Sequence, residues 1–237
     1  NNEGGSVIGT RATAQGVQDY WERIVDECSR EIAELPNNPL RYYKRAQAYK
    51  ELGNLELALG DLTRVIDLKS DDPKAYILRA GIHRQLKQNR RALQDFHIAI
   101  YLNSSDANAY LLRGNIYKIE GQLKEAVQDA TESIRLDPSQ PQSHVLRGNA
   151  YFELNSYDKA IADFSKAIEL DNSYTNAYYF RAMLYHRIRK NDAAIVDYQK
   201  VLQLSPDSQA GRLAQRKLEI MTSPDQESQS DAEDELF

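Results

Sequence analysis

The sequence predicts an all-α solenoid built from five antiparallel helix pairs. The first observation behind this prediction is a spacing of 34 residues that recurs without insertion or deletion, and internal repeats of 20–50 residues are typical of solenoids. The second is that apolar residues within each repeat recur three and four positions apart, as in amphipathic helices. A hydrophobic content of 41% and a charged content of 27% are ordinary for a folded chain.

Arginine and aspartate mark the repeat most clearly. Each repeat has an arginine followed directly by alanine or glycine, and an aspartate 16 residues after the arginine. The pairs are Arg45 and Asp61, Arg79 and Asp95, Arg113 and Asp129, Arg147 and Asp163, and Arg181 and Asp197. Because a guanidinium can bond a carboxylate bidentately, we predict partly buried salt bridges across each helix pair. The alternative is a row of arginines free to bind an anionic ligand.

The elements follow in order along the chain. Residues 1–16 lack periodicity and are predicted to be disordered, whereas an apolar stripe over 17–36 indicates a capping helix that Pro36 ends. A mostly polar helix over 208–221 is expected to cap the other end, and the acidic segment 222–237 is predicted to be disordered. The repeats between them span 39–72, 73–106, 107–140, 141–174 and 175–208.

A short break separates the two helices of each repeat. Gly53 and Gly121 lie in two of these breaks and suit the left-handed residue that ends a helix. Pro138 and Pro206 are expected to stop the second helices of the third and fifth repeats. Each repeat is thus predicted to be a helix, a tight turn and an antiparallel helix.

The chain resembles the tetratricopeptide repeat (TPR) family over residues 39–208. The resemblance rests on the period of 34, a small residue after each arginine, a ring four residues after it and an alanine at mid-repeat. It implies a right-handed superhelical array whose first helices line a concave face. It also places buried aromatic residues on second helices at Phe96, Phe164 and Tyr198, whereas Ala130 departs from this pattern and predicts thinner packing in the third repeat.

The resemblance implies that the concave face binds an extended peptide or a partner helix. Amide side chains there could bond a peptide backbone, and apolar residues could receive its side chains. The candidate groove residues are Lys74, Asn108, Leu111, Leu112, Asn115, Gln142, Leu146, Asn149, Asn176, Tyr179, Phe180 and Met183.

One known mode of binding in this family is not expected. Its co-chaperones clamp the terminal carboxylate of chaperone peptides with lysine, asparagine and arginine residues at set positions. Asn115 matches one of these positions, but Leu111 stands where a lysine is required and Leu146 where an asparagine is required. A chaperone C-terminal clamp is therefore not predicted.

Composition argues against several other functions. Six of the 35 acidic residues lie in the segment 222–237, so residues 1–221 carry 30 basic and 29 acidic residues, which gives no electrostatic case for nucleic acid. No apolar run is long enough for membrane insertion. No nucleophile, metal-ligand or phosphate-loop pattern is present, so we expect no enzyme activity, no cofactor and no metal.

The single cysteine, Cys28, favours a reducing compartment, and a cytoplasmic location is expected. The sequence therefore predicts a non-catalytic scaffold or adaptor for protein–protein interaction and complex assembly. Two alternatives remain open. The chain could be a structural subunit that uses its convex face and end caps, or an accessory domain of a longer protein, since it begins without methionine.

Overall fold

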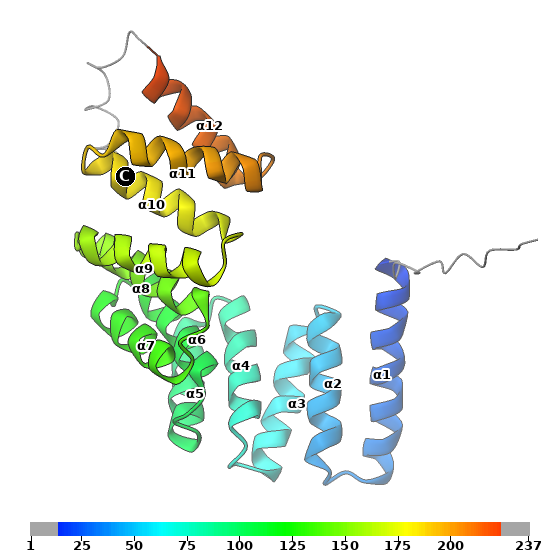
Figure 1. Ribbon diagram of the computed structural model, residues 1–237. Helices are drawn as coiled ribbons and strands as arrows, with labels where there is room; N and C mark the ends of the chain where they lie inside the picture. Colours follow the sequence, from blue (N-terminus) through cyan, green and yellow to red (C-terminus); the bar gives the residue numbers. More distant parts are fainter. Residues whose placement is uncertain (1–13, 224–237) are drawn as a thin grey trace, which may run out of the picture. The chain divides into compact units, whose positions relative to one another are not determined.

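The computed structural model describes residues 14–223, which form twelve α-helices and no strand (Figure 1). The all-α fold class is therefore confirmed. The helices are α1 (Ala14–Glu34), α2 (Pro39–Glu51), α3 (Leu55–Leu68), α4 (Pro73–Gln85), α5 (Asn89–Leu102), α6 (Ala107–Ile119), α7 (Leu123–Leu136), α8 (Pro141–Glu153), α9 (Tyr157–Leu170), α10 (Thr175–Arg187), α11 (Asn191–Leu204) and α12 (Gln209–Thr222).

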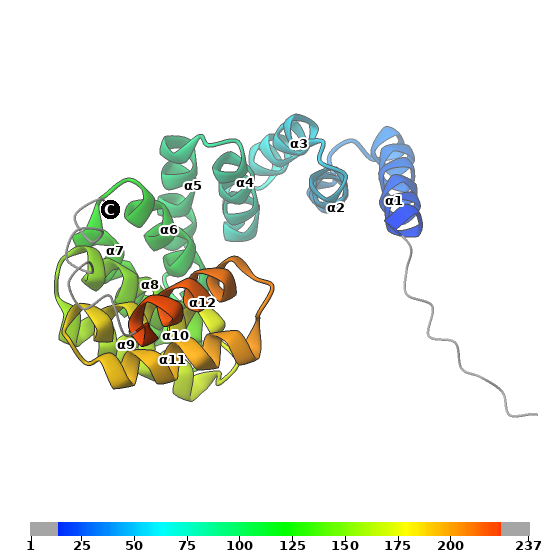
Figure 2. The ribbon, with the colours of Figure 1, turned by 90° about the horizontal axis from the view of Figure 1, so that it is seen from above.

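Each of the five repeats forms one antiparallel helix pair, beginning with α2 and α3 and ending with α10 and α11. Helix α1 packs on α2 before the first repeat. Helix α12 follows the last repeat and packs on both α10 and α11, over which it lies in Figure 2. Because α1 begins at Ala14, residues 14–16 are helical rather than disordered as predicted. The other residues with predicted disorder, 1–13 and 224–237, lie outside the described residues, whereas Thr222 is the last residue of α12.

The chain divides into two compact units. Helices α1 to α5 belong to an N-terminal unit that ends at Ser104, and helices α6 to α12 belong to a C-terminal unit that begins at Ser105. The unbroken 34-residue register did not predict this division.

Side chains just before the first helices fix where these helices begin. The side chains of Asn38, Asp72 and Asp106 accept backbone N–H groups of α2, α4 and α6, which satisfies donors that have no partner within the helix. Pro39 and Pro73 occupy the first position of their helices, where a missing N–H costs no hydrogen bond. The first helices of the first three repeats thus carry their own start signals in the sequence.

The tight turns within the repeats share one backbone geometry. Gly53 and Gly121 have φ angles of 78° and 72°, which confirms the left-handed conformation predicted for them. Lys87, Asn155 and Arg189 take the same place in the other repeats, with φ between 56° and 60°. In each turn the next residue donates its N–H to the carbonyl five residues back at 2.8 Å, as in a Schellman motif.

Small and aromatic residues fill the space between helices. Phe96, Phe164 and Tyr198 on the second helices are fully buried, as the resemblance implied. In the third repeat the small Ala130 is fully buried, and Leu111 and Leu146 pack against it. Packing around Ala130 is thus completed by a side chain of the next repeat.

Candidate interaction surface

One salt bridge joins the two helices of each of the five repeats. Each arginine donates from Nε and Nη2 to the two carboxylate oxygens of its aspartate at 2.7–2.9 Å. The aspartates are only 3–6% exposed. The predicted structural role of the arginines is confirmed, because their charge is satisfied inside the repeat rather than offered to a ligand.

Further groups hold each guanidinium in place. The guanidinium carbon of Arg45 lies 5.7 Å from the ring centres of both Tyr42 and Tyr49, a cation–π arrangement that recurs with minor changes in other repeats. Its Nη1 also donates to the hydroxyl of Ser29 on the preceding helix at 3.0 Å. In the same way, Arg79 donates to the hydroxyl of Thr63, Arg147 to that of Thr131, and Arg181 to that of Ser165.

Sequence reasoning missed these hydroxyls, although their spacing of 16 residues before the arginine is constant. The same register position before the third repeat is His97. The hydroxyls extend four of the five bridges to a residue of the preceding repeat or, for Arg45, of the capping helix.

The fourth repeat adds a histidine to its salt bridge. His144 Nδ1 lies 3.2 Å from Asp163 Oδ1, and both side chains are buried. Burial alone would raise the pKa of Asp163, but hydrogen bonds from Arg147 and His144 outweigh it and hold the pKa below its usual value. His144 therefore packs in the position that a tyrosine occupies in the other four repeats, and it additionally bonds the aspartate.

The candidate groove residues divide between the two units. Lys74 is exposed on α4 of the N-terminal unit, whereas the other eleven lie on α6, α8 and α10 of the C-terminal unit. In that unit α8 lies beside both α6 and α10. The first helices of three successive repeats thus present one row of candidate residues.

Leu111 and Leu146 are exceptions to the prediction. They are 7% and 3% exposed and pack with Ala130, so neither side chain is available to a ligand. The physical reason is the small side chain of Ala130, beside which both leucines are buried. The 34-residue register suggested a groove position for Leu146, but it does not show which side chains pack beside this residue.

The candidate amide residues differ in their exposure and in their hydrogen bonds. Asn108, Gln142 and Asn176 are exposed in the first turns of their helices. Asn149 is half-buried, and so is Asn115, whose amide donates to the backbone carbonyl of Leu111 at 2.9 Å. The exposed amides therefore lie at the N-terminal ends of the three helices.

An aromatic cluster fixes the candidate groove residues of α10. Phe180 stacks on Phe164 with ring centres 5.6 Å apart, and Tyr179 lies 6.0 Å from the ring of Tyr198. Desolvation raises the pKa of Tyr179. Met183 packs half-buried on the same core, and on α6 Leu112 is also half-buried. These side chains present edges of an ordered core rather than mobile groups.

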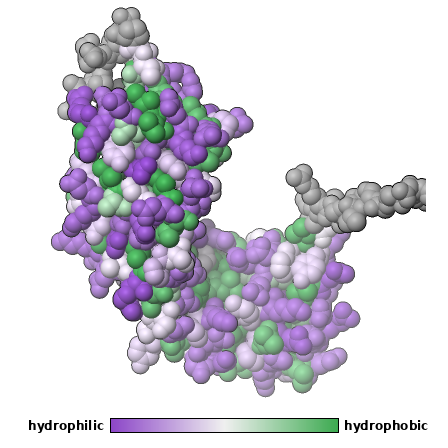
Figure 3. Space-filling view, viewed as in Figure 1, coloured by the Kyte–Doolittle hydropathy of each residue, from purple (hydrophilic) through white to green (hydrophobic). Residues whose placement is uncertain are grey.

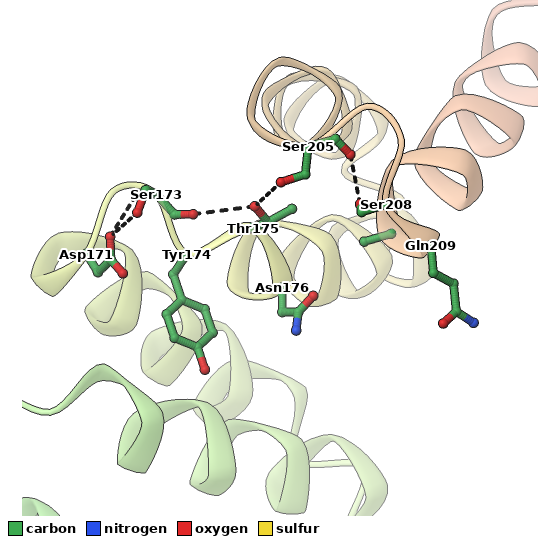
Figure 4. Close-up of a pocket in the computed structure, with 9 residues that line it drawn as sticks. Asp171, Ser173, Tyr174, Thr175, Asn176, Ser205, Ser208 and Gln209 are labelled. Carbon is green, nitrogen blue, oxygen red and sulfur yellow. Dashed lines mark hydrogen bonds between the residues drawn. The ribbon is translucent and has the colours of Figure 1, made fainter. Parts of the chain in front are cut away.

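A shallow hollow of about 450 Å³ lies at the N-terminal ends of α10 and α12, where the loops before these two helices meet (Figure 4). Its polar groups are largely bonded to one another. Ser173 donates to Asp171 Oδ1, and the hydroxyls of Thr175 and Ser205 lie 3.1 Å apart. Asn176 is the only candidate groove residue among those lining it. The hollow supplies loop–loop hydrogen bonds rather than a set of groups directed at a substrate.

On the face drawn in Figure 3, hydrophobic residues lie in separate small groups among hydrophilic ones. Within residues 14–223, no three His, Cys, Asp or Glu side chains are grouped so that they could bind a metal ion. None of the twelve helices described is both long and apolar enough to cross a bilayer.

Sequence profiles of one family match most of the repeat region. A profile described as TPR repeat matches residues 114–154 and 148–188, and two described as tetratricopeptide repeat match residues 43–96 and 175–208. No curated protein gives a significant match.

Solved structures of other repeat proteins are similar in fold. YrrB, described as a TPR protein with an unusual peptide-binding site, has a TM-score of 0.67 and 18% identity over 81% of this chain and 99% of its own. MamA from Desulfovibrio magneticus RS-1 has a TM-score of 0.67 and 22% identity over 72% of this chain and 97% of its own. A thermophilic TPR protein from Thermus thermophilus has a TM-score of 0.59 and 21% identity over 76% of this chain and 98% of its own. The helix pairs, their salt bridges and these matches together show that the chain belongs to the tetratricopeptide repeat family.

Proposed function

We propose that the chain is a non-catalytic scaffold that binds an extended peptide or a partner helix along α6, α8 and α10. The observation that carries this proposal is the row of partly exposed apolar and amide residues on three adjacent first helices. Leu112, Tyr179 and Met183 offer apolar contacts, and Asn108 and Asn176 offer hydrogen bonds. The printed description of YrrB, which has a peptide-binding site, supports the same class of function.

The remaining candidate residues have revised roles in this proposal. Leu111 and Leu146 are buried and support the row from behind, and Phe180 positions Tyr179 through ring contacts. A cytoplasmic location and a role in assembling a complex are part of the proposal. It includes neither a cofactor nor nucleic acid.

Selection of peptides that bind the chain tests the proposal. Random 12-residue peptides would be selected on the immobilised full chain, and each would then be titrated by calorimetry. The chain has only two methionines, Met183 and Met221, so ¹³C-methyl labelling gives two assignable signals. We expect peptide binding to shift the Met183 signal, and the double variant Asn149→Ala, Met183→Ala to weaken binding about tenfold.

The matched control is Val196→Ala, which changes an exposed apolar residue on the outer face of α11. Peptides that lose affinity with the groove variant but keep it with the control would support the groove. Peptides whose affinity is unchanged by the groove variant would contradict it and favour the convex face or the end caps.

A further inference from the structure

The turn between α4 and α5 is unusually basic. Four cations, Arg84, Lys87, Arg90 and Arg91, occur within eight residues that contain no acid, whereas the equivalent eight residues of every other repeat contain at least one. The second repeat, residues 73–106, has six basic and two acidic residues, and one acid, Asp95, is already bonded to Arg79. The charge of this turn is therefore not balanced within its own repeat.

None of these four cations forms an ion pair among the residues that the structure describes. All four are exposed, and Arg91 Nη1 donates to a neutral acceptor, the side chain of Gln88, at 3.2 Å. Arg90 and Arg91 also lie in the first turn of α5, where the helix dipole disfavours cations. The first turns of the other four second helices carry an acid instead: Glu56, Glu125, Asp158 and Asp192.

Lys87 has a backbone conformation that most residues avoid. Its φ is 58°, and the equivalent residues of the first and third repeats are Gly53 and Gly121. Glycine adopts this conformation without steric cost, whereas lysine does not. The sequence thus places a cation where local backbone preference favours glycine.

The exposed face of α5 continues from the basic turn into apolar residues. Tyr101 is 88% exposed and Ile98 is 40% exposed, and both lie on the same face of the helix as Arg91 and Gln94. The residues that replace Ile98 and Tyr101 in the other repeats are all charged or polar: Arg64, Glu132, Lys166 and Lys200, and Asp67, Arg135, Glu169 and Gln203. We call the residues Arg90, Arg91, Gln94, Ile98 and Tyr101 the outer face of α5.

We propose that the α4–α5 turn and the outer face of α5 bind the acidic segment 225–237 of this chain. The segment has six acidic residues and no basic one, and its last acids are followed by Leu236 and Phe237. The order of groups matches: cations precede apolar residues along α5, and acids precede apolar residues along the segment.

The length of the acidic segment agrees with the length of the outer face of α5. The outer face spans about 16 Å from Arg90 to Tyr101 at the helical rise, and five to six extended residues cover a similar distance. Residues 232–237 supply that length with three acids followed by two apolar side chains. The proposal concerns the N-terminal unit and does not depend on the groove of α6, α8 and α10.

Titration of a labelled peptide tests the proposal. The probe is a fluorescent peptide of residues 223–237, and the receptor is the full chain whose own six acids in this segment are changed to Asn or Gln. We expect saturable binding that weakens as salt rises, because the attraction is between exposed charges. The double variant Arg90→Gln, Arg91→Gln should weaken binding about tenfold.

The matched control is Lys124→Gln, Lys159→Gln, which removes two cations from the equivalent positions on α7 and α9. It should change the affinity less than twofold. Equal losses in the two double variants, or no binding to the parent chain, would overturn the proposal.

Two further variants separate docking from general attraction of charges. Lys87→Gly should weaken binding without unfolding the protein, because glycine is the residue of the first and third repeats at this position. Ile98→Ser, Tyr101→Ser should weaken binding of the parent peptide but not of a peptide with Leu236→Ser, Phe237→Ser. Tighter binding of a 15-nucleotide RNA than of the parent peptide would contradict the proposal and indicate a nucleic-acid surface.

Discussion

The buried aspartates are the residues on which each repeat depends most directly. A carboxylate with 3–6% exposure needs its arginine, because an unpaired charge in this position cannot be solvated. The arginine is less buried; in three repeats it lies over two tyrosine rings, and in four repeats it donates to a hydroxyl. We therefore expect loss of the arginine to destabilise a repeat more than loss of the aspartate.

Replacing Arg113 tests this dependence. Arg113→Leu leaves Asp129 buried and unpaired, and we expect the free energy of unfolding to fall by about 3–5 kcal/mol. The double variant Arg113→Leu, Asp129→Leu removes the stranded charge and should recover most of this loss. Urea unfolding followed by circular dichroism measures both. A double variant no more stable than Arg113→Leu would show that the stranded charge is not the cause.

Asp163 should make stability depend on pH in the acid range. Its pKa is lower in the folded protein than its ordinary value of about 3.9, so the stabilisation is present above that value and is lost as pH falls through the folded pKa. Unfolding measured from pH 7 to pH 2 should show a constant stability difference from Asp163→Asn above about pH 5. The difference should shrink below about pH 4. A difference that persists unchanged to pH 2 would rule out this linkage.

Residues also show how far the sequence alone could lead. The Arg–Asp pairs were predictable because residues 16 apart on either side of a tight turn meet across a helix pair. The burial of Leu146 was not, because it depends on the size of Ala130 in another repeat. Hydroxyls such as Thr131 lie at a constant spacing but were missed, since threonine alone indicates no particular partner.

At the scale of a helix pair, the turn sets the register that brings each arginine opposite its aspartate. All five turns place one residue in the left-handed conformation, and only two of those residues are glycine. A side chain at this position strains the backbone, whereas the remainder of the pair is regular helix.

Two glycine substitutions distinguish the effect on stability of a side chain added in the turn from that of one added within a helix. Gly121→Ala introduces a side chain at φ 72° and should destabilise the protein by about 1 kcal/mol. Gly60→Ala lies within α3, where an added Cβ meets nothing within 4 Å, and should stabilise it by up to about 1 kcal/mol. Thermal melts of both variants measure the contrast. Shifts of the same sign would contradict the role assigned to the turn.

At the scale of the whole molecule, stability is expected to be local. Repeats in a solenoid contact only their neighbours, and the chain divides into two compact units. The sequence predicted the helix pairs but not this division, because the 34-residue register passes Ser104 without change and the register does not describe packing between repeats.

Hydrogen exchange should reveal this locality. Leu62→Ala removes a fully buried side chain from the first repeat, and Phe164→Ala removes one from the fourth, each at a cost of several kcal/mol. We expect Leu62→Ala to lower amide protection in α2 to α4 and Phe164→Ala to lower it in α8 to α10. Equal loss of protection over the described helices in both variants would indicate a single cooperative unit instead.

The closure of every salt bridge within its own 34 residues has a consequence for how such a chain can change in length. Removing or copying a whole repeat leaves no arginine without its aspartate, and the preceding hydroxyl recurs at the same offset in four of five cases. An insertion inside a repeat, by contrast, would move the two charges apart. Evolution can therefore lengthen or shorten this array in whole repeats more readily than it can alter the interior of any one of them.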